Sequence, residues 1–216
     1  MRTLTTGVLI TLEGIDGSGK STLAANLAAA FVKEQLPVIL TQEPGKTGLG
    51  KLVKPIVQEK KVPLHPLAEF FLFAADRAQH FDEIVIPALA AHQIVISDRM
   101  ADSSLVYQGY GKGLDLDRIH QVNTWAMRSI QPTLVIYVKV DPAVARARLI
   151  ARKQGLSSFE HYISYQEKIA AGFDTLLAHR PHVLTVNGEL DQETLTLTTF
   201  TSIVERLSSQ GLLQCI

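Results

Sequence analysis

Residues 14–21 read Gly-Ile-Asp-Gly-Ser-Gly-Lys-Ser and fit the pattern G-x-x-x-x-G-K-[ST] of a phosphate-binding loop. The apolar run at 8–12 predicts a buried strand before the loop, and the Ala- and Leu-rich run at 22–32 predicts a helix after it. Glycines let successive backbone N–H groups point at phosphate oxygens, and the helix N-terminus adds positive potential. We therefore expect a nucleoside triphosphate on these residues: Gly14, Ile15, Asp16, Gly17, Ser18, Gly19, Lys20, Ser21 and Thr22.

Five apolar segments rich in Val, Ile or Leu predict strands, at 7–13, 37–41, 93–97, 133–140 and 182–186. Helical patterns fill most of the sequence between them. Strands that alternate with helices predict an α/β fold, a five-stranded parallel sheet with helices on both faces. Ligands of such sheets bind at the carboxyl ends of the strands. We expect one domain over 1–216, in which residues that follow strand ends form the site.

The composition excludes several classes of protein. Lys plus Arg and Asp plus Glu number 21 each, so no overall field attracts nucleic acid or an anionic membrane. The single cysteine, Cys215, excludes an internal disulfide and a multi-cysteine metal site. No apolar run reaches the length of a membrane span, and no signal-peptide pattern is present. We expect a soluble cytoplasmic protein that binds neither nucleic acid nor membrane.

Asp98 and Arg99 follow the apolar run 94–96 after one serine, Ser97. A carboxylate there can hold Mg²⁺ together with Ser21, although Asp98 could instead cap the next helix. A guanidinium at the same edge suits bidentate binding of phosphate. These positions predict Lys20 on the β- and γ-phosphates, Ser21 and Asp98 on the metal, and Arg99 on a phosphate.

Phenylalanines stand at 70, 71 and 73 within a long helical pattern. Three in four residues cannot all share one helix face, so some face the core and others a second apolar surface. Phe73 and Arg77 lie four residues apart and share a face, where they could stack on and bond a base. On composition alone, the same stripe also fits a core or an oligomer interface.

The helix expected after Asp141 carries arginines at 146, 148 and 152. Arg148 and Arg152 share a face. Such a cluster is usually a solvated basic face, but beside a phosphate loop it can be a lid that brings an arginine to the transferring phosphoryl group. Because Gly17 adds no charge to the loop, we expect a lid at about 146–160 to supply positive charge to the transferring phosphoryl group.

With these residues in view, the chain resembles the bacterial thymidylate kinases, and the resemblance runs nearly from end to end. It rests on residues 13–22, on Thr-Gln-Glu-Pro-Gly at 41–45, on Leu-Phe-Ala-Ala-Asp-Arg-Ala-Gln-His at 72–80, and on Asp98-Arg99 with Ser-Ser-Leu-Val-Tyr-Gln-Gly at 103–109. The loop is common to many kinases, whereas the other segments are more specific. The resemblance implies a P-loop NTPase three-layer sandwich that transfers the γ-phosphoryl group of ATP to dTMP with Mg²⁺, as a homodimer packed through helices.

The resemblance also implies roles for single residues. Phe73 would stack on thymine, Arg77 would bond its O4 edge, and Tyr107 would crowd the 2′ position of the sugar. Glu43, Ser104 and Gln108 complete the expected dTMP site. The expected catalytic residues are Lys20, Asp16 near the acceptor, Arg99 between acceptor and donor phosphates, and the lid arginines Arg148 and Arg152.

Two arginines that the family usually has are absent from this sequence. Gln42 stands where the family usually has arginine, and Ser157-Ser158 stand where its lid usually ends in Asp-Arg. Lys46 replaces a customary glycine and Met100 a customary aromatic residue or histidine. Two alternatives therefore stay open: a kinase for another nucleoside monophosphate, such as dUMP, or a nucleotide-binding regulator of weakened activity.

Overall fold

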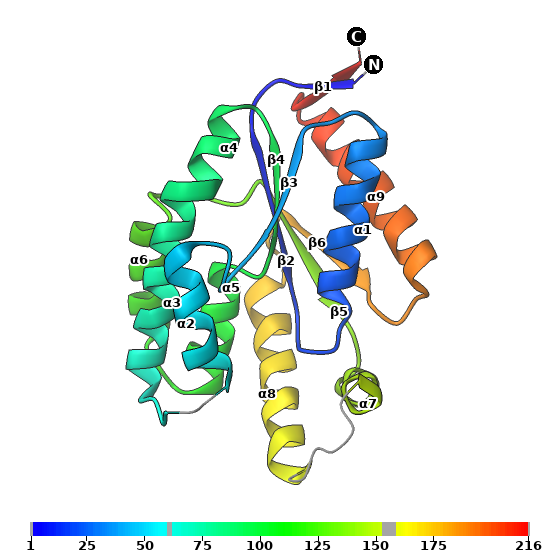
Figure 1. The fold of residues 1–216 in the computed structure, drawn as a ribbon. Helices are drawn as coiled ribbons and strands as arrows, with labels where there is room; N and C mark the ends of the chain where they lie inside the picture. The colour runs from blue at the N-terminus through cyan, green and yellow to red at the C-terminus, as the bar shows by residue number, and fades with distance from the viewer. Residues whose placement is uncertain (1, 60–61, 153–158, 216) are drawn as a thin grey trace.

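The computed structural model describes residues 2–59, 62–152 and 159–215 (Figure 1). Its central sheet has five strands in the order β3-β4-β2-β5-β6, and every neighbouring pair is parallel. The predicted five-stranded parallel sheet is confirmed, with strand ends that differ by a residue or so. The strands are β2 (Val8–Glu13), β3 (Val38–Gln42), β4 (Ile94–Asp98), β5 (Leu134–Lys139) and β6 (Val183–Asn187).

Helices cover both faces of the sheet, which confirms the three-layer α/β fold. On one face lie α1 (Lys20–Lys33) and α9 (Gln192–Ser209); on the other lie α3 (Pro66–His80), α4 (Ile86–Ala90) and α8 (Phe159–Leu177) (Figure 1). Alternate side chains of β2 show why both faces are apolar. Ile10 packs in one core with Leu27 of α1, whereas Leu9 packs in another with Phe81 after α3. Both cores are buried, so the strands read as continuous apolar runs.

Six further helical segments complete the described part of the fold. They are α2 (Gly48–Glu59), η1 (Phe81–Val85), α5 (Ala101–Ser104), η2 (Leu105–Gly111), α6 (Leu116–Ala126) and α7 (Pro142–Arg152). The segments η1 and η2 are π-helical, which the sequence patterns do not predict. No helix in the described ranges is both long enough and apolar enough to cross a bilayer.

A second, two-stranded sheet joins the two ends of the chain. Strands β1 (Arg2–Leu4) and β7 (Leu213–Cys215) pair in antiparallel fashion (Figure 1). The sequence analysis has no strand at either place. Each strand has three residues, too few for a period-two pattern to be recognised.

Candidate functional site

The phosphate-binding loop connects β2 to α1 in the strand–loop–helix arrangement that the sequence predicts. Three of its glycines, Gly14, Gly17 and Gly19, have φ of 143°, 86° and 94°. These angles lie in the region that side chains other than glycine rarely adopt. The glycines therefore give the loop its curl, and the loop leads directly into the N-terminus of α1.

Helix α7 packs directly on the loop at Gly17. A Cβ atom on Gly17 would lie 2.4 Å from the carbonyl oxygen of Ala145 and 3.0 Å from Cγ of Leu149. The loop position therefore has no room for a side chain, in addition to its positive φ. The expectation that Gly17 supplies no charge has a packing reason as well as a chemical one.

Lys20 is buried beneath the loop. Its Nζ donates to the carbonyl oxygen of Ile15 at 2.7 Å and to Oγ of Ser18 at 3.3 Å. Burial lowers the pKa of Lys20 to about 7, and the nearby charge of Arg99 adds to this effect. A bound phosphate would oppose both influences, because negative charge favours the protonated amine. An anion bound in the loop would therefore raise the pKa of Lys20 and keep its amine protonated.

Ser21 and Asp98 lie together at the carboxyl ends of the strands. Oγ of Ser21 donates to Oδ2 of Asp98 at 2.5 Å. Magnesium in nucleotide sites is held by one or two protein oxygens, with waters and phosphates completing the octahedron. A hydroxyl and one carboxylate beside the loop fit that ion. No cluster of three or more His, Cys, Asp or Glu suited to a metal occurs in 2–59, 62–152 or 159–215, so a dedicated all-protein cage is not found there.

Arg99 joins the loop to the opposite side of the site. Its guanidinium donates to the carbonyl oxygen of Gly14 at 3.0 Å, to Asp16 at 2.5 Å and to the hydroxyl of Tyr107 at 3.2 Å. The Arg99 backbone has φ of 70°, in the left-handed region that disfavours such a residue. The structure thus brings together Asp16, Arg99 and Tyr107, three of the residues that the sequence analysis expects in the site.

Glu13 holds this strained position from beneath, a contact that the sequence analysis misses. Its carboxylate, which is fully buried, accepts from the Met100 N–H at 2.8 Å and from the Ser103 hydroxyl at 2.6 Å. Oγ of Ser103 in turn accepts from Arg99 at 2.9 Å. Burial, with a further contribution from the charge of Asp102, raises the pKa of Glu13 to about 7. In the sequence, Glu13 is marked only as the one charged residue of an otherwise uncharged strand.

Arg77 lies at the centre of a buried polar cluster. Its Nε donates to Glu43 at 2.8 Å, and its Nη1 donates to Oγ of Ser104 at 3.2 Å and to Oδ1 of Asn123 at 2.5 Å. The second oxygen of Glu43 lies 2.9 Å from Nδ1 of His80. Burial alone would raise the pKa of Glu43, but Arg77 and His80 outweigh it and hold that pKa below its ordinary value.

This cluster refines the expected dTMP site. Both oxygens of Glu43 are occupied by protein groups, so Glu43 fixes Arg77 rather than facing the solvent side of the site. Nη2 of Arg77 makes no hydrogen bond within the described residues and is the atom left for a ligand. Asn123 and His80 are missed by the sequence analysis. His80 lies three residues after Arg77 on the same helix face, which is a signal that could have found it.

The three phenylalanines of α3 separate as their spacing predicts. Phe70 is 2% exposed and packs in a core cluster, whereas Phe71 is 52% exposed. Phe73 is half-buried, one turn before Arg77. Gln108, expected near the base, is buried and donates to Glu69 at 2.7 Å. Phe73 is therefore the one of the three that combines partial exposure with the face of Arg77.

Of the expected lid at about 146–160, the structure describes residues 146–152 and 159–160. Arg148 on α7 donates to the carbonyl oxygen of Gly188 at 2.7 Å. Gly188 adjoins the loop, since a Cβ there would lie 3.0 Å from the carbonyl oxygen of Ser18. Arg148 is thus close to the phosphate loop. The side chain of Arg152 and residues 153–158, which include Ser157 and Ser158, lie outside the described residues.

The sequence and the fold of this chain are similar to those of known proteins. The family model described as "Thymidylate kinase" matches residues 12–196. The thymidylate kinase of Synechococcus sp. (strain JA-2-3B'a(2-13)) is 41% identical over 174 residues, 81% of this chain and 82% of the relative. That of Prosthecochloris aestuarii is 33% identical over 212 residues, 94% and 95% of the two chains. The crystal structure of thymidylate kinase from Ehrlichia chaffeensis matches with a TM-score of 0.76 at 28% identity, covering 92% of this chain and 99% of the other.

Proposed function

The chain belongs to the thymidylate kinase family, and we propose on this basis that it transfers the γ-phosphoryl group of ATP to dTMP, giving dTDP and ADP. One observation carries the proposal. Arg99 contacts Gly14 and Asp16 of the phosphate loop and, outside the loop, Tyr107 of η2. A guanidinium in that place can bind the phosphates of donor and acceptor together, which phosphoryl transfer requires.

The donor half of the site is the phosphate loop. We assign the loop N–H groups and Lys20 to the β- and γ-phosphates. Ser21 and Asp98 would hold Mg²⁺, which when bound neutralises charge on the phosphates. Lys20 then keeps its proton in the low-dielectric site and stabilises charge that develops on the transferring group.

The acceptor half of the site is the surface formed by α3 and η2. We assign Phe73 to stacking on thymine and Nη2 of Arg77 to its O4. Glu43 and Asn123 hold the guanidinium in place, and Ser104 and Gln108 lie nearby. Tyr107 would crowd a 2′-hydroxyl and so favour deoxyribose. A base whose edge failed to match would leave Arg77 buried without a partner there, a penalty of about 1–3 kcal/mol.

The remaining charge stabilisation is assigned to a lid at about 146–160. Since Gly17 cannot carry a side chain, Arg99, Arg148 and Arg152 are the arginines proposed to neutralise the transferring phosphoryl group. Arg148 lies on a helix that contacts the loop, so its movement from Gly188 to a phosphate would be short. Closure of the lid would also exclude water, which limits hydrolysis of ATP.

A coupled assay of ADP release tests this function. We expect Mg²⁺-dependent ADP formation with dTMP, and a far lower rate with dUMP, dCMP, dGMP or AMP. Robust turnover with another monophosphate but not with dTMP would instead favour the first alternative.

We further propose that the protein is a homodimer whose interface includes α2, α3 and α6. Helix α3 packs against both neighbours, and these helices carry exposed apolar side chains. They include Leu52, Phe71 and Trp125, which are 70%, 52% and 81% exposed. Large exposed apolar groups gathered on neighbouring helices are typical of protein interfaces. Sedimentation should give a dimer that Trp125→Asp weakens; a monomer at micromolar wild-type protein would refute this assignment.

The proposed location is the cytoplasm, with neither nucleic acid nor membrane as a partner. This rests on the balanced charge and the single cysteine of the sequence.

A further inference from the structure

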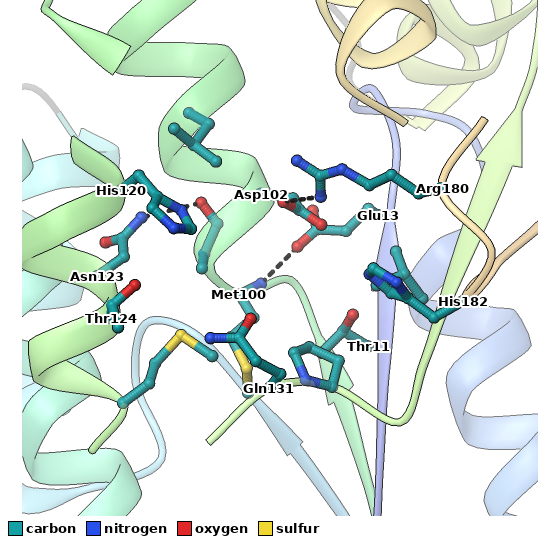
Figure 2. Close-up of a pocket in the computed structure, with 15 residues that line it drawn as sticks. Thr11, Glu13, Met100, Asp102, His120, Asn123, Thr124, Gln131, Arg180 and His182 are labelled. Carbon is teal, nitrogen blue, oxygen red and sulfur yellow. Dashed lines mark hydrogen bonds and ion pairs between the residues drawn. The ribbon is translucent and has the colours of Figure 1, made fainter. Parts of the chain in front are cut away.

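A cavity of about 290 Å³ lies behind the candidate active site (Figure 2). Helices α5 and α6 form one side, and the turn between α8 and β6 forms the other. The cavity lining includes none of the residues of the phosphate loop, nor Phe73, Arg77 or Tyr107. Its volume falls at the lower end of the range for ligand pockets, so it suits a ligand smaller than a typical drug molecule.

One polar side chain in the cavity is buried without a partner. Thr11, in the middle of β2, is 1% exposed, and its hydroxyl makes no hydrogen bond within the described part of the chain. Figure 2 shows this hydroxyl directed into the cavity, on the same side as Glu13. Buried hydroxyls nearly always pair with protein or with water, so one that faces a cavity is available to a guest that enters it.

The charges around the cavity are not balanced. Glu13 and Asp102 are two carboxylates on its floor, whereas Arg180 is the one Lys or Arg of the lining. Arg180 is already paired with Asp102 at 2.9 Å. The printed donors to Glu13 are neutral, and Arg99, whose charge also acts on Glu13, is paired with Asp16 outside the cavity. A bound group that balances the negative charge of this lining is a cation.

The walls of the cavity are apolar. Met100, Leu105, Met127 and Val135 are all buried and line it. Methionine side chains adapt to flat rings and pack well against aromatic edges. The lining therefore combines an acidic floor, a free hydroxyl and flexible apolar walls, while His120 and His182 lie among the remaining residues that line it.

We propose that this cavity is a binding site for a small organic cation, an amine or amidine carried on a flat apolar body. The cationic group lies against Glu13 and Asp102 and donates to the hydroxyl of Thr11. The apolar body packs between Met100 and Met127. No residue assigned to direct contact with ATP or dTMP lines the cavity, so the cation binds together with either nucleotide.

Titration calorimetry on the full chain with benzamidinium tests the proposal, and neutral benzamide of nearly the same shape is the control. We expect benzamidinium to bind at least tenfold more tightly than benzamide, with unchanged affinity in saturating dTMP, ADP and Mg²⁺. Equal affinities, or no heat with benzamidinium at millimolar concentration, would overturn the proposal. Displacement of benzamidinium by the nucleotides would place it in the active site and would also overturn it.

Two variants locate the bound cation. Thr11→Val removes the hydroxyl with little change of volume, and Thr124→Phe on α6 fills the cavity from its partly exposed side. Each should weaken benzamidinium at least tenfold. Thr198→Phe, on an exposed position of α9 across the sheet, is the matched control and should leave binding unchanged. If Thr11→Val fails to fold, Thr124→Phe still decides, because wild-type affinity in that folded variant would refute the location.

Discussion

Replacing Glu43 by glutamine should destabilise the protein through Arg77. The two side chains are 2% and 3% exposed and are joined at 2.8 Å, so the change leaves a buried guanidinium without its counter-charge. Breaking a buried ion pair in this way costs about 3–5 kcal/mol. Glutamine keeps one oxygen that can accept from Nε of Arg77, which places the loss near 3 kcal/mol. That is a large fraction of the roughly 5–15 kcal/mol by which domains are stable.

Urea unfolding followed by circular dichroism at pH 7 measures this loss. Asp82→Asn is the matched control, because Asp82 pairs with Arg128 on the surface at 3.1 Å. Exposed pairs contribute about 0–1 kcal/mol, so the control should scarcely change the free energy of unfolding. A loss below about 1 kcal/mol for Glu43→Gln would refute the reasoning, since the buried pair would then behave like a surface pair.

The pH dependence of the free energy of unfolding tests the direction of the pKa shift of Glu43. The pKa of Glu43 is lower in the folded protein than its ordinary value of 4.5. A carboxylate of this kind contributes its stability fully above its unfolded pKa, and that contribution is lost as pH falls through the folded pKa. The difference in unfolding free energy between wild type and Glu43→Gln should therefore be constant near neutrality and shrink below about pH 4.5. A difference that grows on acidification would contradict the assignment.

Three further changes test the site by steady-state kinetics and urea unfolding. Lys20→Ala should lower turnover by about 10²-fold or more, since it removes charge from the phosphates; unchanged turnover would remove Lys20 from the mechanism. Phe73→Ala should raise the KM for dTMP by an amount equivalent to about 1–3 kcal/mol while the KM for ATP stays constant. If Phe73→Ala raised the KM for ATP as much as the KM for dTMP, Phe73 would be a core residue. The buried control Phe70→Ala should instead lower the free energy of unfolding by about 3–5 kcal/mol. Gly17→Arg should reduce turnover, because a Cβ at that position would lie 2.4 Å from the carbonyl oxygen of Ala145. Wild-type turnover in this variant would show that α7 can move away from the loop at little cost.

The sequence was sufficient for the sheet and the loop because both depend on local signals. The strands are buried on both faces and so read as unbroken apolar runs, and the glycines of the loop mark positions of positive φ. The π-helical segments and the terminal ribbon were missed. A ribbon of three-residue strands depends on the meeting of residues some 210 positions apart, for which no local pattern exists.

The site was predicted by type of residue better than by contact. Arg77, Arg99 and Tyr107 stay predictions as ligand-binding residues, and the groups that hold them do not stand out in the sequence. Asn123 contacts Arg77 from 46 positions away, and Glu13 reaches Ser103 across 90. Such partners are fixed by the crossing of helices over the sheet. A sequence pattern therefore proposes side chains for ligand binding, but it does not identify the side chains that support them.

The fate of the γ-phosphoryl group tests the central claim most directly. Wild-type protein in excess over γ-labelled ATP, with dTMP and Mg²⁺, should convert the label to dTDP in a single turnover. Label that appears as inorganic phosphate, or that stays in ATP while both nucleotides are shown to bind, would contradict the account. The latter result would support a nucleotide-binding regulator instead.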